Sequence, residues 1–392
     1  MHKLQALEPK KRINSIDILR GMALFGVLIV NLIFQFRISI FEQFVVEPFA
    51  SPWWIDRVIE RLVYYGLESK AVLVFSFLFG VGLAVQYERF QKMDSPLYWL
   101  RRRMLVLLVF GLLHLLLIWN GDILAEYALA ALLLLPLLAA PGWVLALSSL
   151  CLFAIYIVIS IIPLPVAAYE KAWIMQHLPI ANAVYATGSY GQILQLSLSE
   201  IPSLLPLHLY IFPRTLALML LGAYLWRSGF LQHPAAHRSL LINLARTGLV
   251  LGASLMIVTT TEAYDDWDAI NPLRTAIQNI TVVILAGGYA AAVIALVEFT
   301  RAGTWLHVFA PIGRMAFTNY IMQSVIFTFI FYGYGLGQFG QLGITPVFLL
   351  GVLVYGLQGV FSAWWLRYFR LGPLEWLWRT LTYGKLQSMK RN

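Results

Sequence analysis

The sequence is poor in cysteine and in charged residues. Its one cysteine, Cys151, lies within an apolar run, which excludes a disulfide framework and a cysteine metal site, and we expect no metal cofactor. Charged residues make up only 12% of the 392 residues. The sequence also lacks a Walker loop, a dinucleotide-binding glycine fingerprint, an H-E-x-x-H motif and a G-x-S-x-G motif. ATP-driven transport by this chain alone is therefore not expected.

Apolar residues dominate the chain. They account for 60% of it, with 13 tryptophans, and the mean hydropathy is +0.75. This composition is typical of a polytopic helical membrane protein, in which a run of about 20 apolar residues forms one spanning helix. We therefore predict an all-α membrane bundle of about ten transmembrane helices. The expected spans are residues 16–36, 69–87, the two halves of 101–135, 143–162, 206–226, 240–261, 272–297, 308–332 and 345–365.

The lysines and arginines predict the orientation of the bundle. The net charge of +9 lies in short flanks between apolar runs, which is the positive-inside pattern and does not indicate a nucleic-acid partner. We predict that both termini are cytoplasmic. Residues 1–15 form a basic tail, 16–368 a single transmembrane domain with its longest outer loop at 163–205, and 369–392 a cytoplasmic tail.

The strongest candidate for chemistry is a hairpin at residues 101–135. It reads as two apolar helices joined by a turn at 120–122, with His114, Asp122 and Glu126 near that turn. An unpaired ionisable group in hydrocarbon costs several kcal/mol, so these side chains need partners or a wet cavity. We predict that His114 is a general base oriented by Asp122 or Glu126. The alternative is that His114 is a satisfied core residue.

Other polar residues interrupt the apolar runs and suggest two cavities. An outer cavity could combine the residues of the hairpin with polar side chains from other spans, and an inner cavity could lie near the cytoplasm. The alternatives are that these cations extend to the interface and that the amides only join helices by hydrogen bonds. The outer candidates are Lys70, Tyr127, Arg214 and Arg274, the inner ones are Arg20, Arg314, Glu375 and Arg379, and the amides are Asn31, Asn319 and Gln323.

Three consecutive arginines, Arg101, Arg102 and Arg103, begin the hairpin. They are either a topology signal or, as planar cations that bind phosphate in a bidentate way, part of a phosphate site.

Motifs along nearly the whole chain resemble the bacterial DUF418 family, also called the YeiB family, of uncharacterised inner-membrane proteins. The resemblance implies a multi-pass protein of the bacterial cytoplasmic membrane. The motifs are IDILRG at 16–21 with Asn31, FSFLFG at 75–80, Gly111 with His114, GDIL at 121–124 through Tyr127, GRMAFTNY at 313–320 with Gln323 and Ser324, GPLEWLWR at 372–379, and LTYG at 381–384.

That family is similar, through its first span, to transmembrane acyltransferases: the acyltransferase-3 group and the lysosomal heparan glucosaminide N-acetyltransferase. The resemblance implies a fold in which cytoplasmic acyl-CoA supplies an acyl group to an acceptor across the membrane. In the acyltransferase-3 pattern a basic residue precedes a histidine by eleven positions. Here Arg20 holds the basic position and Asn31 the histidine position. The glucosaminide enzyme keeps an asparagine there and uses a histidine in the next loop, whereas residues 32–68 here contain no histidine.

The leading hypothesis is acyl transfer across the membrane. Arg20, Arg314 and the residues Arg101 to Arg103 would bind the phosphates of acyl-CoA, His114 would deprotonate the acceptor, and Asn31, Asn319 or Gln323 would stabilise the oxyanion. The acceptor would be a hydroxyl or amine of a sugar, lipid or small molecule at the outer face. The alternatives are a transporter or flippase for an amphipathic solute or lipid, and a non-catalytic member that binds lipid. Membrane lipid is an expected partner, and a homodimer is left open.

Overall fold

The computed structural model describes residues 14–45, 49, 51–93, 95–161, 171–260 and 272–391. Across these ranges the chain is helical, and its one β-type contact is an isolated bridge between Phe369 and Lys390. The α-helices are α1 Asn14–Asn31, α2 Trp54–Gly66, α3 Lys70–Phe90, α4 Pro96–Leu117, α5 Leu124–Leu134, α6 Gly142–Ile161, α7 Lys171–Thr187, α8 Tyr190–Arg227, α9 Arg238–Thr260, α10 Pro272–Phe299, α11 Ala310–Arg314, α12 Ala316–Phe331, α13 Ile344–Tyr368 and α14 Pro373–Tyr383. Shorter helical pieces are η2 Leu32–Phe36, η3 Glu42–Phe44, η4 Leu135–Ala139, η6 Pro234–His237 and η7 Arg301–Phe309.

The prediction of an all-α membrane bundle is confirmed. In the described part of the chain, 7 helical stretches are long and apolar enough to cross a membrane, and α5 and α12 are shorter apolar helices. The ten expected spans coincide with α1, α3, α4, α5, α6, α8, α9, α10, α11 with α12, and α13. The number of crossings and the cytoplasmic position of the termini stay predictions.

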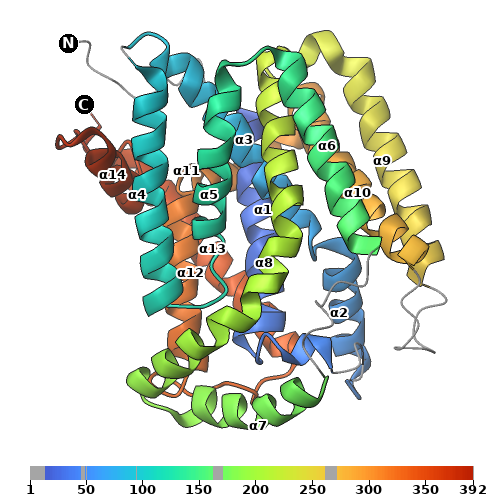
Figure 1. Cartoon of the computed structure of the whole chain (residues 1–392), viewed down its shortest axis with the longest axis vertical. Helices are drawn as coiled ribbons and strands as arrows, with labels where there is room; N and C mark the ends of the chain where they lie inside the picture. The colour runs from blue at the N-terminus through green and yellow to red at the C-terminus, as the bar shows by residue number, and fades with distance from the viewer. Residues whose placement is uncertain are drawn as a thin grey trace.

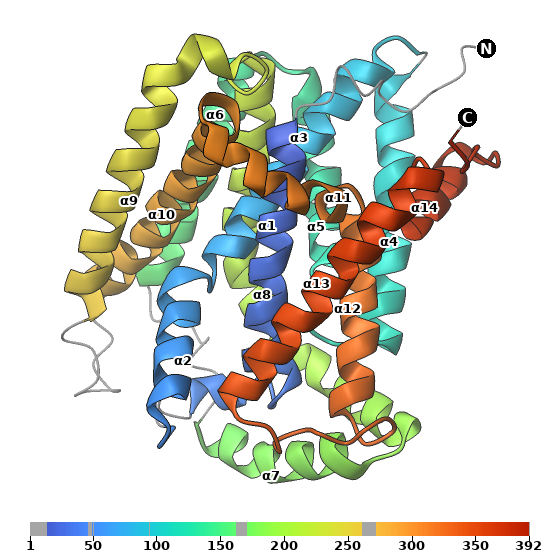
Figure 2. The ribbon, with the colours of Figure 1, turned by 180° about the vertical axis from the view of Figure 1, so that it is seen from behind.

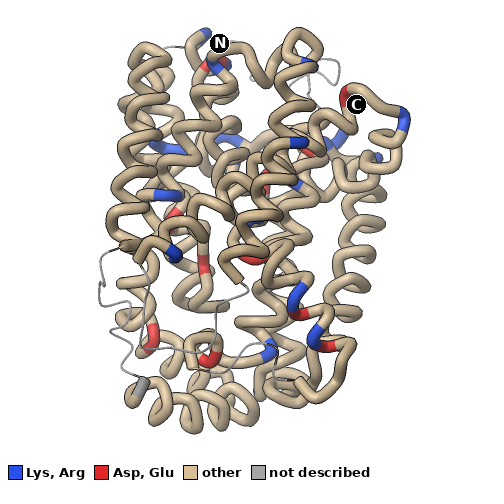
Figure 3. Tube along the Cα trace, turned by 90° about the vertical axis from the view of Figure 1, so that its right-hand side faces the viewer, with Lys and Arg blue, Asp and Glu red and all other residues tan. Residues whose placement is uncertain are grey.

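Helix α1 lies in the middle of the bundle and packs against α3 and α11 (Figures 1 and 2). The pair α9 and α10 packs on one side, and α4, α5, α12 and α14 lie on the other. Helix α7 crosses the end of the bundle that is opposite the two chain termini. Charged residues lie at mid-height of the bundle as well as at its ends (Figure 3), so several of them need partners inside the protein.

Helices α3 and α8 approach each other closely through small residues. A Cβ atom at Gly80 would overlap the backbone carbonyl of Met219, and one at Gly222 would overlap the carbonyl of Phe77. Without a hydrophobic driving force in lipid, such close backbone contacts are a main source of attraction between membrane helices. The two glycines therefore fix the α3–α8 contact against which α1 and α5 pack.

The stretch predicted as a long outer loop, 163–205, is largely helical where the structure describes it. It contains α7 and the first turns of α8, which runs for 38 residues through Pro202, Pro206 and Pro213. Proline normally breaks a helix, but membrane helices tolerate it where neighbouring groups satisfy the freed carbonyls. A capping box at Ser189 and Gln192 begins α8 before these prolines. Residues 162–170 lie outside the described ranges.

The span predicted at 308–332 is interrupted. Helix α11 ends at Arg314, Met315 has non-helical backbone angles (φ −114°, ψ 32°), and α12 begins at Ala316. The region predicted as a tail, 369–392, contains α14, which packs against α4 and α12 (Figure 2). The break and the docked helix meet at one cavity.

Candidate functional site

The hairpin places His114 and Asp122 in direct contact. Helix α4 ends three residues after His114, and a short non-helical connection returns the chain to α5. Nδ1 of His114 lies 2.8 Å from Oδ1 of Asp122, while Oδ2 of Asp122 accepts the Ala125 N–H at 2.7 Å in the first turn of α5. His114 is 1% exposed and Asp122 3% exposed. One carboxylate therefore both caps α5 and orients the imidazole.

This contact leaves one imidazole nitrogen available. A carboxylate beside Nδ1 favours the tautomer in which Nδ1 carries the proton and Nε2 is an acceptor. Nε2 of His114 is buried and has no hydrogen-bond partner among the residues that the structure describes. A buried polar atom of this kind needs an explanation, and a proton-accepting role is one of them.

Tyr320 connects this pair to a cavity. Its ring centroid lies 5.3 Å from that of His114, and its hydroxyl accepts the N–H of Ile123 at 3.4 Å. Tyr320 also lines a cavity of about 220 Å³. His114 itself does not line this cavity, and Tyr320 is in contact with both the imidazole and the open volume.

The cavity is cationic and aromatic. Polar side chains that line it include Arg20, Arg103, Arg314, Gln86 and Glu375, and its apolar lining includes Phe75, Phe79, Leu107 and Phe317. Arg20 also contacts Asp17 at 3.1 Å. Cations beside an apolar volume suit an amphipathic anion, because guanidinium groups bind phosphate and carboxylate oxygens.

Helix α14 forms one wall of the cavity. Oε1 of Glu375 accepts the N–H groups of Phe317 and Thr318 at 2.8 and 3.1 Å, and Oε2 accepts the Thr318 hydroxyl at 2.5 Å. The carboxylate therefore caps the N-terminus of α12 after the break at Met315. Burial raises the pKa of Glu375 above its ordinary value, although the hydrogen bonds from Thr318 and Phe317 act in the opposite direction.

The structure separates the three consecutive arginines. Arg103 lines the cavity, whereas Arg101 is exposed and Arg102 donates to the Leu381 carbonyl at 3.2 Å. The predicted inner residues Arg20, Arg314 and Glu375 do lie together, but Arg379 does not line the cavity.

The other predicted residues do not assemble into one outer cavity. Glu126 binds His208 at 2.9 Å and Thr215 at 2.7 Å, so it is not the partner of His114. The three remaining cations each have a partner of their own: Lys70 donates to the Tyr64 carbonyl, Arg214 to the Tyr156 hydroxyl and Arg274 to the Thr259 carbonyl. The Tyr127 hydroxyl is hydrogen-bonded to Ser76, and Tyr127 lines the cationic cavity.

The amides expected at an oxyanion site mainly join helices. Asn319 Nδ2 donates to Ser362 at 3.0 Å, and Gln323 Nε2 donates to Gln358 at 2.8 Å, which links α12 to α13. Asn31 ends α1 and is partly buried. None of these amides lines the cationic cavity.

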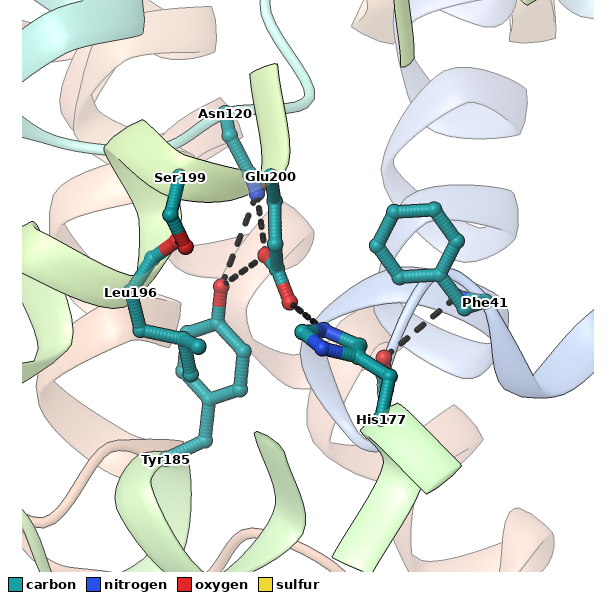
Figure 4. Close-up of polar contacts among 8 residues, drawn as sticks. Phe41, Asn120, His177, Tyr185, Leu196, Ser199 and Glu200 are labelled. Carbon is teal, nitrogen blue, oxygen red and sulfur yellow. Dashed lines mark hydrogen bonds and ion pairs between the residues drawn. The ribbon is translucent and has the colours of Figure 1, made fainter. Parts of the chain in front are cut away.

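The sequence interpretation missed a second buried cluster, at the α7 end (Figure 4). Oε2 of Glu200 accepts from Asn120 Nδ2 at 2.7 Å and from the Tyr185 hydroxyl at 2.6 Å, and Oε1 lies 2.7 Å from His177 Nε2. Glu200 is 1% exposed. His177 and Glu200 are ionisable residues in apolar surroundings, a signal that could have found the cluster, but the stretch 163–205 is predicted as a loop. His208 lies in the predicted span 206–226 and is a further ionisable residue that the sequence interpretation left out.

The fold and the site define a polytopic membrane protein with internal polar sites. The bundle is helical and apolar, and it holds buried histidine–carboxylate pairs and an arginine-lined cavity.

Residues 225–385 match the family model described as "Protein of unknown function (DUF418)". The chain is 34% identical to the uncharacterized protein YxaH of Bacillus subtilis (strain 168), over 100% of this chain and 99% of that protein. It is 28% identical to the uncharacterized protein YeiB of Escherichia coli (strain K12), over 94% and 95% of the two chains. A third relative, the uncharacterized 39.9 kDa protein in amylase 3'region of Bacillus acidopullulyticus, is 27% identical over 96% of this chain and 95% of its own length. The chain belongs to the DUF418 family, as its motifs indicated.

Proposed function

We propose that this protein is a membrane-embedded acyltransferase that uses cytoplasmic acyl-CoA to acylate a hydroxyl or amine acceptor. The observation that carries the proposal is the position of the His114–Asp122 pair next to an arginine-lined cavity, with Tyr320 in contact with both. A histidine whose Nδ1 is held by a carboxylate is the arrangement of a general base.

Acyl-CoA would bind with its charged and apolar parts in different regions of the cavity. Arg20, Arg103 and Arg314 supply cations for the phosphates, and the aromatic lining accommodates the pantetheine arm. Glu375 adds a negative charge to the same wall, which opposes anion binding unless its carboxyl is protonated or displaced.

His114 would accept a proton from the acceptor and later donate it to the CoA thiolate. Its Nε2 accepts the proton of the acceptor while the acceptor oxygen or nitrogen attacks the thioester carbonyl carbon. The carbon–sulfur bond then breaks, the acyl group remains on the acceptor, and the CoA thiolate takes the proton from His114. Asp122 stabilises the imidazolium between these two transfers. A positioned general base of this kind typically contributes about 10²- to 10⁴-fold to the rate.

Tyr320 would have two functions. Its hydroxyl accepts the Ile123 N–H, so its own proton can be donated to the developing oxyanion. Because His114 does not line the cavity, a side chain beside it, such as that of Tyr320, would also move when the acyl group enters. The amides of Asn319 and Gln323 are already engaged with Ser362 and Gln358.

Radiolabelled acetyl-CoA, incubated with the purified protein and a membrane extract, tests the proposal. Label on an acceptor that disappears with His114→Gln supports acyl transfer. No label on any acceptor or on the protein, although CoA binds, would contradict it. The membrane extract supplies lipid, sugar and small-molecule acceptors together, so the acceptor does not have to be known beforehand.

The broken helix at Met315 favours a second candidate, a transporter or flippase. Discontinuous helices form the substrate sites of many secondary transporters, because their ends present free backbone groups. Here the N-terminus of α12 and the end of α11 lie at the cationic cavity, and a substrate anion at α12 would have to replace Glu375, which accepts the Phe317 and Thr318 N–H groups. Uptake of an amphipathic solute into liposomes without CoA would support transport, whereas label transfer would support the enzyme.

A further inference from the structure

Histidine–carboxylate contacts recur inside this bundle. Among the residues that the structure describes, three histidines lie 2.7 to 2.9 Å from a carboxylate oxygen. The pairs are His177 with Glu200, His114 with Asp122, and His208 with Glu126. All three carboxylates are at least nine-tenths buried, at 1%, 3% and 8% exposure.

The pair at the α7 end reaches the protein surface. The side chain of His177 is 13% exposed, and its ring stacks on Trp173 at a centroid distance of 4.7 Å. Figure 4 shows His177 on one side of Glu200 and Tyr185 with Asn120 on the other. A proton that enters at His177 therefore meets Glu200 as the next group inward.

The α4–α5 connection joins this pair to the next one. Asn120, which binds Glu200, is two residues before Asp122, which binds His114. Asp122 is in turn four residues before Glu126, which binds His208. Asp122 precedes α5 and Glu126 lies in its first turn, so both carboxylates belong to the N-terminal end of that helix.

The three histidine–carboxylate pairs form a series, and its inner end, at His114, adjoins the cationic cavity. The ring of His114 packs on Tyr320, and Tyr320 lines the cavity together with Tyr127. The titratable groups that contact the series are Tyr185 at Glu200 and Tyr320 at His114. The series therefore extends from the surface at α7 to the cavity beside α14.

Physical chemistry favours shared protons along this series. A lone carboxylate costs several kcal/mol in a membrane interior, and the cost falls when a histidine shares a proton with it. Chains of aspartate, glutamate and histidine inside membrane helices are the usual form of proton relays.

We propose that these histidine–carboxylate pairs form a proton pathway from the α7 end of the bundle to the cationic cavity. A hydronium ion protonates His177 at Nδ1, His177 passes its Nε2 proton to Glu200, and a water molecule carries that proton past the Asn120 amide to Asp122. When His114 is in its Nε2–H tautomer, Nδ1 accepts the proton from Asp122 while Nε2 releases its own proton toward the cavity. The imidazole is then left as the Nδ1–H tautomer and returns to the Nε2–H tautomer before the next transfer. Glu126 and His208 form a side branch that holds a second proton. This function does not depend on acyl transfer.

Proton flux into proteoliposomes tests the pathway. The full-length protein is reconstituted with internal pyranine, and valinomycin with a potassium gradient supplies the driving potential. We expect internal acidification faster than in protein-free liposomes, and a rate at least about tenfold lower for Glu200→Gln, which removes the titrating group but keeps its size. Glu298→Gln, at an exposed carboxylate on α10, is the matched control and should conduct like the natural protein.

A second variant tests the pathway if Glu200→Gln does not fold. If Glu200→Gln does not elute as a monodisperse species, His177→Gln removes the entry group from a site near the surface and should give the same loss. Equal flux in the natural protein and in protein-free liposomes would overturn the proposal. So would full flux in a folded His177→Gln or Glu200→Gln protein. Because the assay contains no acyl-CoA, its outcome is separate from that of the acyltransferase assay.

Discussion

The guanidinium carbon of Arg103 lies 3.7 Å from the ring centroid of Trp378, and the indole N–H of Trp378 donates to the Arg103 carbonyl at 2.9 Å. These two contacts join α4 to α14 and hold Arg103 at the wall of the cavity. An arginine stacked in this way is pre-organised for an anion, because less side-chain freedom is lost when the anion binds.

We expect Arg103→Ala to weaken binding of CoA. Loss of one charge-assisted contact costs about 1.5 to 3 kcal/mol, which corresponds to a Kd raised roughly 10- to 150-fold. Isothermal titration with CoA measures the change. Arg101→Ala is the matched control, because Arg101 is exposed and outside the cavity. Equal weakening by both variants would mean that general surface charge, and not this site, binds CoA.

We expect Asp122→Asn and His114→Gln each to lower acyl transfer by at least about 10²-fold. An asparagine at position 122 can still cap α5, but its amide does not select the required tautomer of His114. The folded fraction, measured by size exclusion, should therefore remain near that of the natural protein. Activity within threefold of the natural protein in a folded Asp122→Asn variant would remove this pair from the mechanism.

We expect Gly80→Ala to destabilise the bundle. The added Cβ would overlap the Met219 carbonyl and separate α3 from α8, and overpacking of this kind costs about 1 to 3 kcal/mol. Gly82→Ala, on the same helix, should be neutral or slightly stabilising, since its Cβ would meet no described atom within 4 Å. Thermal unfolding in detergent compares the two. A similar loss for both would show that helix α3, and not its contact with α8, limits stability.

We expect Glu375 to make stability depend on pH. Burial raises the pKa of Glu375 in the folded state, so the folded protein binds this proton more tightly than the unfolded chain does. The stabilising contribution is therefore present at low pH and is lost as the pH rises through the raised pKa. Between pH 5 and pH 8 the melting temperature of the natural protein should fall more than that of Glu375→Gln.

One result of comparing the natural protein with Glu375→Gln would contradict the pH dependence expected from Glu375. Parallel pH profiles for the natural protein and Glu375→Gln would show that the carboxyl of Glu375 has the same proton affinity in the folded and unfolded states. The docking of α14 on α12 would then owe nothing to the titration of this group.

Sequence alone determined the properties that depend on local composition. Apolar runs of sufficient length predict membrane helices because hydrocarbon requires every backbone group to be satisfied within the helix. The turn at 120–122 is also a local property, and it brought His114 and Asp122 within reach of each other. Local pattern could not choose between Asp122 and Glu126 as the partner of His114, since both lie near the same turn.

Tertiary packing decided the rest. Glu126 is bound by His208 and Thr215, which are 82 and 89 residues away in the sequence. Arg103 is held at the wall of the cavity by Trp378, 275 residues further on, whose ring packs on its guanidinium. Hydropathy and spacing carry no information about which distant side chains meet, because such contacts are set by the crossing of helices and by the small residues that let them approach.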